Sequence, residues 1–195
     1  MIHHPDIDID FGDREDVIAV IKSIPAAKFN KGKISKHNTG VYIQPIPVNP
    51  TNGFANIMFK EADSRGYFKL DLLNVSIYKM IQDQDHYEKL LNTDPPWHRL
   101  NEQAFVEKII HINNYFSTVS EMMPDNIPRM AMFLSAIRPA KRHLLHKPWK
   151  EISETIWDAV DDGTYAFKKS HSIAYAVLVT LHMNLINEQD SNPSV

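Results

Sequence analysis

The sequence predicts an α+β fold, in which a small mixed sheet is followed by a helical region. Three observations support this class. Residues 5–11, PDIDIDF, alternate between Asp and apolar residues, with the two-residue period of a strand that has one polar face. Residues 40–48, 54–59 and 66–73 are short apolar runs bounded by Gly, Pro and Asn. From residue 75 onward, apolar residues recur at spacings of three and four, as in amphipathic helices.

The composition is typical of a folded globular chain. Of the 195 residues, 43% are hydrophobic and 23% are charged, and this length can bury a core without cross-links. The absence of cysteine excludes disulfides, thiolate zinc sites and cysteine nucleophiles, and it agrees with the cytoplasmic location that we expect. There is no long apolar run and no apolar secretory signal, so we expect no membrane partner.

The first strand is expected to lead directly into a helix. Asp13 is placed to cap the N-terminus of this helix, which should run to about Ser23 and stop before Pro25. Spacings of three and four predict its buried stripe, which comprises Val17, Val20, Ile21 and Ile24.

The segment between this helix and residue 75 is expected to hold a loop and the remaining strands. Residues 28–37, KFNKGKISKH, are basic and contain glycine, which predicts a loop. Strands are expected at 40–48, 54–59 and 66–73, with Asn52-Gly53 as the hairpin turn between the first two. The prolines within 40–48 indicate a strand that ends early or lies at a sheet edge.

The second half is expected to be helical. A long amphipathic helix is predicted over 105–123, with shorter helices at 127–137, 149–161 and 171–187. The polar tail from Asn187 is expected to fray. The predicted parts of the chain are therefore a region with a small sheet at 1–75, a helical region at 76–186 and a polar tail at 187–195.

Three carboxylates share one face of the first strand. Asp6, Asp8 and Asp10 are two residues apart, so neighbouring members are about 6.6 Å apart along the strand. Their mutual repulsion would raise their pKa values unless a cation neutralises them. Mg²⁺ prefers carboxylate oxygens and is the economical candidate. The alternative is an amphipathic edge strand with a solvated face.

Asp71 interrupts the apolar run Phe68–Leu73, where a buried and unpaired acid is costly. If the 66–73 strand lies beside the 5–11 strand, Asp71 joins the aspartate cluster. Carboxylates from two neighbouring strands suit a two-metal site for phosphoryl displacement.

Four segments resemble, in the same order, the C-family of bacterial replicative polymerases, which includes the alpha subunit of DNA polymerase III. They are PDIDIDFGDREDVI, KHNTGVYIQPIPV, GYFKLDLLNVSIYKMI and FKKSHSIAYAVLVTLH. They are similar to that family's Pro-Asp-x-Asp, Lys-His-x-x-Gly-Val-x-Ile, Lys-x-Asp and Lys-Ser-His-Ser-x-Ala-Tyr-Ala segments. A weaker similarity covers MAMFLSAIRP, where the family has glycine after Arg-Pro. Four blocks in one order are more specific than any one of them.

The resemblance implies a palm of the polymerase-beta nucleotidyltransferase type. It implies that Asp6, Asp8 and Asp71 are catalytic and bind two Mg²⁺ ions, for which Mn²⁺ could substitute. Asp10 would support these ligands without binding metal itself. The implied activity is DNA-directed DNA synthesis, with a primer-template and deoxynucleoside triphosphates as partners.

Nucleotide or DNA contacts are expected in three regions, the first and third from the resemblance and the second from its residue pattern. Lys36, His37 and Lys69 would lie near the incoming nucleotide or the primer end. The second region, 138–150, interleaves basic and aromatic residues and would contribute Arg138, Lys141 and Arg142; a solvated surface is the alternative. The third region is expected just ahead of a helix, where cations and the helix N-terminus suit phosphate, and comprises Lys168, Lys169, Ser170 and His171.

Compared with the family, the chain is heavily reduced. No segment corresponds to the Gly-Ser phosphate loop, most of the fingers or the thumb. A second subunit or a second copy of the chain could supply the missing parts. So small a version suits a compact genome such as that of a phage, with host cytoplasm as its location. Two alternatives remain: a palm-derived replication subunit that binds DNA and depends on a partner, and a metal-dependent phosphodiesterase or nuclease.

Overall fold

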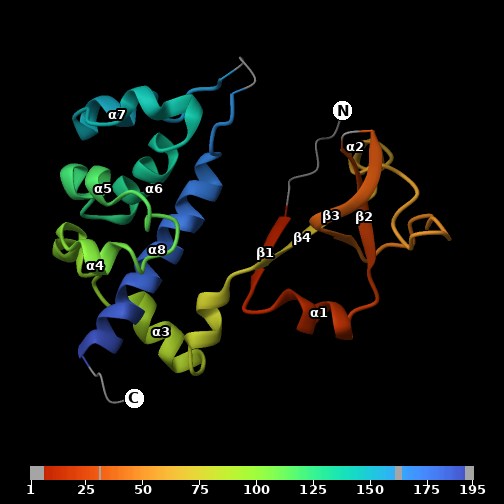
Figure 1. Ribbon diagram of the computed structural model, residues 1–195, viewed down its shortest axis with the longest axis horizontal. Helices are drawn as coiled ribbons and strands as arrows, with labels where there is room; N and C mark the ends of the chain where they lie inside the picture. Colours follow the sequence, from red (N-terminus) through yellow and green to blue (C-terminus); the bar gives the residue numbers. More distant parts are fainter. Residues whose placement is uncertain (1–6, 31, 161–163, 192–195) are drawn as a thin grey trace. The chain divides into compact units, whose positions relative to one another are not determined.

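The computed structural model describes residues 7–30, 32–160 and 164–191 and has a mixed α+β fold, as predicted. A small sheet comes first along the chain and helices follow it (Figure 1). The chain divides into two compact units, Met1–Gln82 and Asp83–Val195. Each unit is described by itself below.

The first unit contains a four-stranded mixed sheet. Its strands are β1 (Ile7–Phe11), β2 (Ile24–Asn30), β3 (Lys33–Tyr42) and β4 (Leu70–Asn74). Their order in the sheet is β1-β4-β3-β2, so β4 lies between β1 and β3 (Figure 1). The β1–β4 pair is parallel, and the other two pairs are antiparallel. This order brings the first strand of the chain beside the last strand of the sheet.

Helix α1 (Arg14–Val20) follows β1, as predicted, but it is shorter. The Asp13 side chain caps it by accepting a hydrogen bond from the Glu15 amide at 3.1 Å. The helix ends before Ile21, whose backbone is extended. The predicted buried stripe is wrong at Val20, which is 82% exposed, whereas Arg14 is buried. This short helix therefore packs through its first turn.

The predicted loop at 28–37 is wrong, because β2 and β3 form a hairpin across this segment. Gly32, with a φ of 79°, lies in the tight connection between the strands. The strand predicted at 40–48 therefore starts at Lys33 and ends at Tyr42. Strand β2 lies at a sheet edge. Pro25 has no backbone N–H to donate, and it is tolerated there because one side of an edge strand has no neighbouring strand to bond.

The strand predicted at 54–59 is also wrong. This region forms two isolated bridges, Ala27–Met58 and Val48–Ala55, and is followed by helix α2 (Phe59–Ser64). The predicted turn at Asn52-Gly53 is present between Val48 and Ala55, and Gly53 has a φ of 73°. Strand β4 starts at Leu70, later than the predicted residue 66. A short 3-10 helix, η1 (Ser76–Met80), follows it.

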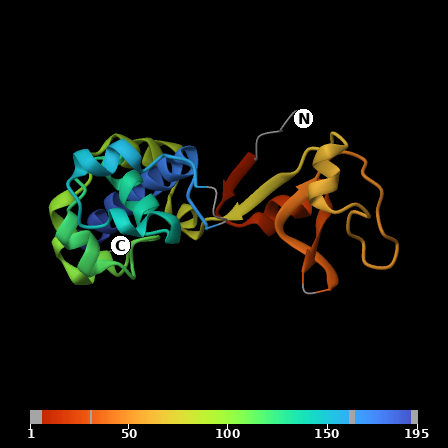
Figure 2. The same cartoon turned by 90° about the horizontal axis from the view of Figure 1, so that it is seen from above.

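The second unit is helical (Figure 2), and its longest described helix is α8 (Lys169–Ser191). In chain order, the others are α3 (Gln84–Asn92), η2 (Trp97–Asn101), α4 (Gln103–Val106), α5 (Phe116–Met122), α6 (Ile127–Ala136), η3 (Pro139–Leu144) and α7 (Trp149–Thr155). The most extensive packing joins α6 to α8, and the core between them includes Phe133, Val179 and Met183. None of the helices in the described ranges is long and apolar enough to span a membrane.

The helix predicted at 127–137 is confirmed as α6, with Asn126 as its N-cap. The long helix predicted at 105–123 is wrong, because α4 ends at Val106 and α5 begins at Phe116. Between them, His111 has a φ of 68°, which an α-helix does not allow. The spacing of apolar residues does not reveal this break, because the turns between α4 and α5 bury their apolar side chains in the same core as the helices do.

Helices α7 and α8 also differ from their predicted bounds. Helix α7 ends at Thr155 rather than at residue 161, which lies outside the described residues. Helix α8 begins at Lys169, earlier than predicted, and continues to Ser191 through the segment predicted to fray. Ion pairs hold this end: Glu188 contacts Lys89 and His86, and Asp190 contacts Arg99 and Lys108.

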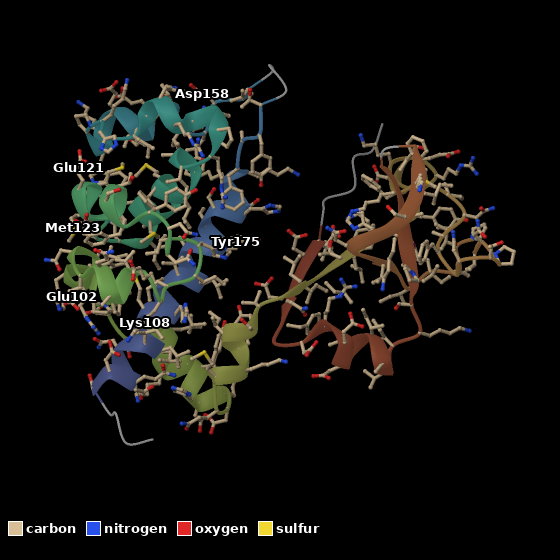
Figure 3. The ribbon with its side chains drawn as sticks, in the orientation of Figure 1. Glu102, Lys108, Glu121, Met123, Asp158 and Tyr175 are labelled. Carbon is tan, nitrogen blue, oxygen red and sulfur yellow. The ribbon has the colours of Figure 1, made fainter. Side chains whose placement is uncertain are left out.

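Two histidines of the second unit have lowered pKa values: half-buried His111 and buried His182. The His111 ring packs on Tyr175, with 4.4 Å between the ring centroids. Tyr175 lies on α8 (Figure 3). The Nε2 atom of His111 is buried and has no hydrogen-bond partner among the described residues. Burial, followed by the charges of Arg138 and His182, lowers the pKa of His111 to about 4. His182 accepts a hydrogen bond from the Ile110 amide at 3.0 Å, and burial lowers its pKa as well.

Candidate functional site

The parallel pairing of β1 with β4 places Asp8 directly opposite Asp71. Paired residues of neighbouring strands project from the same face of a sheet, so the two carboxylates share one face. The two strands are therefore neighbours, which is the arrangement that the role of Asp71 requires. Asp6 lies outside the described residues.

Asp10 lies two residues beyond Asp8 on the same face and is paired with Leu73. Partial burial and, next, the negative charge of Asp8 raise the pKa of Asp10. The repulsion expected from the sequence is thus present between two of the three alternating aspartates. A cation near this face would relieve it.

The Asp71 carboxylate is enclosed and already has polar partners. Asp71 is 8% exposed. Its Oδ1 atom accepts a hydrogen bond from the Thr39 hydroxyl at 2.6 Å, and its Oδ2 atom accepts one from the Lys69 ammonium. The hydroxyl fixes the orientation of the carboxylate, and the ammonium compensates its charge.

His37 organises a bulge in β3 next to Asp71. The β2–β3 register changes between the pairs Pro25–Val41 and Ala27–Lys36, so β3 advances five residues where β2 advances two. The Nδ1 atom of His37 accepts hydrogen bonds from the amides of Gly40 at 2.9 Å and Thr39 at 3.3 Å. The bulge therefore uses a side chain to satisfy amides that leave the ladder.

His37 is neutral in this arrangement, because an Nδ1 atom that accepts hydrogen bonds carries no proton. Burial, followed by the charge of Lys69, lowers the pKa of His37, against the opposing effect of Asp71. The 3.7 Å approach of its Nδ1 to the Asp71 Oδ1 is therefore a contact between neighbours rather than an ion pair. His37 thus shapes the loop that carries Thr39 to Asp71.

Gly40 allows Lys69 to cross β3 and reach Asp71. A Cβ atom at this position would lie 2.7 Å from the Lys69 Cδ and 2.9 Å from the His37 Nδ1. Both approaches are closer than real Cβ contacts. The absence of a side chain at Gly40 is therefore part of how the site is built.

Gly40→Ala is expected to destabilise the first unit by about 1–3 kcal/mol, because the new methyl group overpacks the space occupied by His37 and Lys69. The measurement is urea unfolding followed by far-UV circular dichroism. Gly12→Ala is the matched control, since its Cβ would meet the flexible Lys79 side chain at 3.2 Å. Equal stabilities of the two variants would contradict the role assigned to Gly40.

Further cations gather around the same bulge. The Arg14 guanidinium donates to the Asn38 carbonyl through Nη1, and Lys28 donates to the Asn38 Oδ1 at 2.7 Å. Arg14 is buried, and its Nε and Nη2 atoms have no hydrogen-bond partner among the described residues, although Nε lies 3.6 Å from the Glu15 carboxylate. Lys36, in contrast, is exposed on β3. The carboxylates thus have a cationic border.

The residues predicted for this site from the sequence do not include Arg14, Thr39 or Gly40. Thr39 and Gly40 belong to the KHNTGV segment of the resemblance, which was the available signal. Arg14 follows the N-cap residue Asp13 and has no pattern that distinguishes it from a surface arginine. Its burial depends on the position of Asn38, which is distant in sequence.

The other predicted contacts lie in the second unit. Lys169, Ser170 and His171 form the first turn of α8 rather than preceding it, and Lys168 stands just before the helix. The Lys169 ammonium lies 5.8 Å from the centre of the Trp157 ring. Both residues line an apolar pocket of about 400 Å³ together with Ile127, Met132 and Ile173.

The predicted basic patch at 138–150 has partly structural contacts. Lys141 is buried and donates to the Thr155 carbonyl at 2.8 Å, so its ammonium faces inward. The Arg138 guanidinium stacks over Phe167 at 4.8 Å. Arg142 is exposed, although its Nε contacts the Ile137 carbonyl at 3.3 Å. Of the three, Arg142 has the most accessible charge.

The described ranges contain no group of three or more His, Asp or Glu side chains placed to hold one metal ion. Within them, the first unit offers Asp8 and Asp71, with Asp10 next to Asp8. Two carboxylates from adjacent strands supply hard oxygen ligands, and Mg²⁺ is commonly held by one or two protein carboxylates. The chemistry of this donor set therefore fits such an ion.

Comparison of the chain with protein-family models, with curated proteins and with solved structures finds no match.

Proposed function

We propose that this chain is a nucleotidyltransferase that extends the 3′-hydroxyl of a DNA primer with deoxynucleoside monophosphates. The observation that carries the proposal is the register of β1 with β4, which sets Asp8 opposite Asp71. It joins two segments that separately resemble the palm of C-family DNA polymerases. Carboxylates on adjacent strands suit a phosphoryl-transfer centre.

Asp8 and Asp71 would hold the metal ions, together with Asp6. Bound Mg²⁺ would lower the pKa of the primer hydroxyl and stabilise the pyrophosphate leaving group. Asp10, two residues beyond Asp8 on the same face, would add a further carboxylate beside these ligands.

The cations that border the site would offset phosphate charge. Lys28 donates to the Asn38 side chain, the Lys69 stem passes over Gly40, and Arg14 donates to the Asn38 carbonyl. Lys36 would extend this positive border along β3. Separately, within the second unit, exposed Lys169 at the start of α8 is the proposed phosphate contact.

Primer extension tests this proposal. The full chain is incubated with a labelled primer-template, the four deoxynucleoside triphosphates and Mg²⁺, beside Asp8→Asn and the control Asp16→Asn. Asp16 is an exposed acid of α1 outside the carboxylate face. Extension by the wild type and by Asp16→Asn, together with loss in Asp8→Asn, is the expected result.

Other outcomes would point to other functions. Shortening of DNA without nucleotides would identify a metal-dependent nuclease that directs the same carboxylates at water. DNA binding that persists in Asp8→Asn, without extension by any variant, would instead identify a binding subunit that depends on a partner. Either outcome would contradict a self-sufficient polymerase.

A further inference from the structure

The Lys69 ammonium lies at the carboxylate that the proposed function assigns to a metal ion. Lys69 and Asp71 are both largely enclosed, with 16% and 12% of their side chains exposed. The lysine stem passes over Gly40, and the ammonium also lies 5.9 Å from the centre of the Phe59 ring. Asp71 is thus the single acidic partner recorded for Lys69 in the described residues.

The ammonium and a divalent ion compete for this carboxylate. Both are attracted to the same oxygens, and two positive centres held a few Å apart repel each other. Because the surroundings are partly dry, this repulsion is weakly screened. A metal ion that binds the Asp71 carboxylate would therefore displace the Lys69 ammonium.

We infer that Lys69 is an internal cation that compensates the charge of the Asp71 carboxylate until a metal ion displaces it. This inference rests on the proposed function. It also assigns Thr39 a distinct task, because its hydroxyl holds the Asp71 Oδ1 at 2.6 Å independently of Lys69. The carboxylate therefore keeps its position when the lysine leaves, and the released ammonium becomes available to a phosphate group.

Removal of Lys69 should strengthen metal binding. Lys69→Met keeps an unbranched apolar stem over Gly40 and Phe59 but eliminates the charge. We expect this variant to bind Mn²⁺ about tenfold more tightly than the wild type, because both the competition and the repulsion are removed. The dissociation constant is measured by the electron paramagnetic resonance signal of free Mn²⁺.

Two further variants make the result specific. Lys33→Met, an exposed lysine at the start of β3, removes the same charge without touching Asp71 and should change the affinity less than about twofold. Asp71→Asn should abolish the binding. If binding depends on Asp71 but Lys69→Met does not strengthen it, the displacement is overturned and the metal site stands. If binding does not depend on Asp71, the metal site of the proposed function is overturned as well.

A second measurement needs no variant that might misfold. The ¹⁵N resonance of the Lys69 ammonium is followed in the wild-type chain during a Mg²⁺ titration. Displacement predicts a shift that saturates with the metal and is larger than that of the Lys33 ammonium. An unmoved Lys69 resonance at saturating Mg²⁺ would overturn the inference.

Discussion

Asp71→Asn is expected to lower the rate of nucleotide incorporation by about a thousandfold or more, because the neutral amide replaces a central carboxylate of the proposed site. The amide keeps the size of the side chain, and its oxygen can still accept the hydrogen bond from the Thr39 hydroxyl. The loss would therefore reflect charge rather than shape. Single-turnover primer extension measures it.

The same substitution also affects stability, and this effect must be separated from catalysis. Lys69 loses its partner but remains 16% exposed, so we expect a loss of roughly 1–3 kcal/mol in the free energy of unfolding. Thr39→Val is the matched control, since it removes the hydroxyl and leaves the carboxylate. It should cost about 1 kcal/mol and keep measurable extension. An Asp71→Asn variant that is folded and as fast as the wild type would refute the proposed site.

The second unit is expected to lose about 2 kcal/mol of stability through His111 when the pH falls from 7.5 to 5. Burial and neighbouring cations lower the pKa of this histidine to about 4, whereas its ordinary value is near 6.5. Between pH 6.5 and pH 4, His111 is protonated in the unfolded chain but stays neutral in the folded chain. Stability due to neutral His111 is therefore complete above about pH 6.5 and decreases as the pH falls toward 4.

His111→Asn isolates this effect. Asparagine tolerates the φ of 68° at this position and does not titrate, so the variant should show a flatter dependence on pH than the wild type. All three tryptophans lie in the second unit, and their fluorescence during urea unfolding reports on that unit. At pH 5, most of the contribution from Glu188 and Asp190 is still present, because their lowered pKa values lie below this pH. Identical pH profiles for variant and wild type would contradict the assignment.

The aspartate strand and its helix were predictable because their signals are local. Alternation fixes the faces of β1, and the N-cap at Asp13 marks the start of α1. The pairing of β1 with β4 was foreseen only as a condition for the role of Asp71. No local pattern states which strands become neighbours, since pairing depends on the whole sheet.

The predictions that failed lie mainly where the local residue pattern indicates one structure and the tertiary environment imposes another. The segment at 28–37 is basic because its strands lie at or near a sheet edge, and such strands tolerate charged side chains. Val20 fits a helical stripe but is exposed because its helix ends there. The break at His111 was hidden because the apolar spacing continues through the turns around it.

The position of β1 at the sheet edge also dictates an order of events during folding. Its one neighbour in the sheet is β4, which lies some sixty residues further along the chain. During synthesis, Asp8 therefore leaves the ribosome long before β4, the strand that pairs with β1, has been made. The β2–β3 hairpin can close locally, whereas β1 must wait for a distant closure with its higher entropic cost. Asp8 and Asp71 come together only at that last step, so a chain truncated before β4 has no partial version of this site.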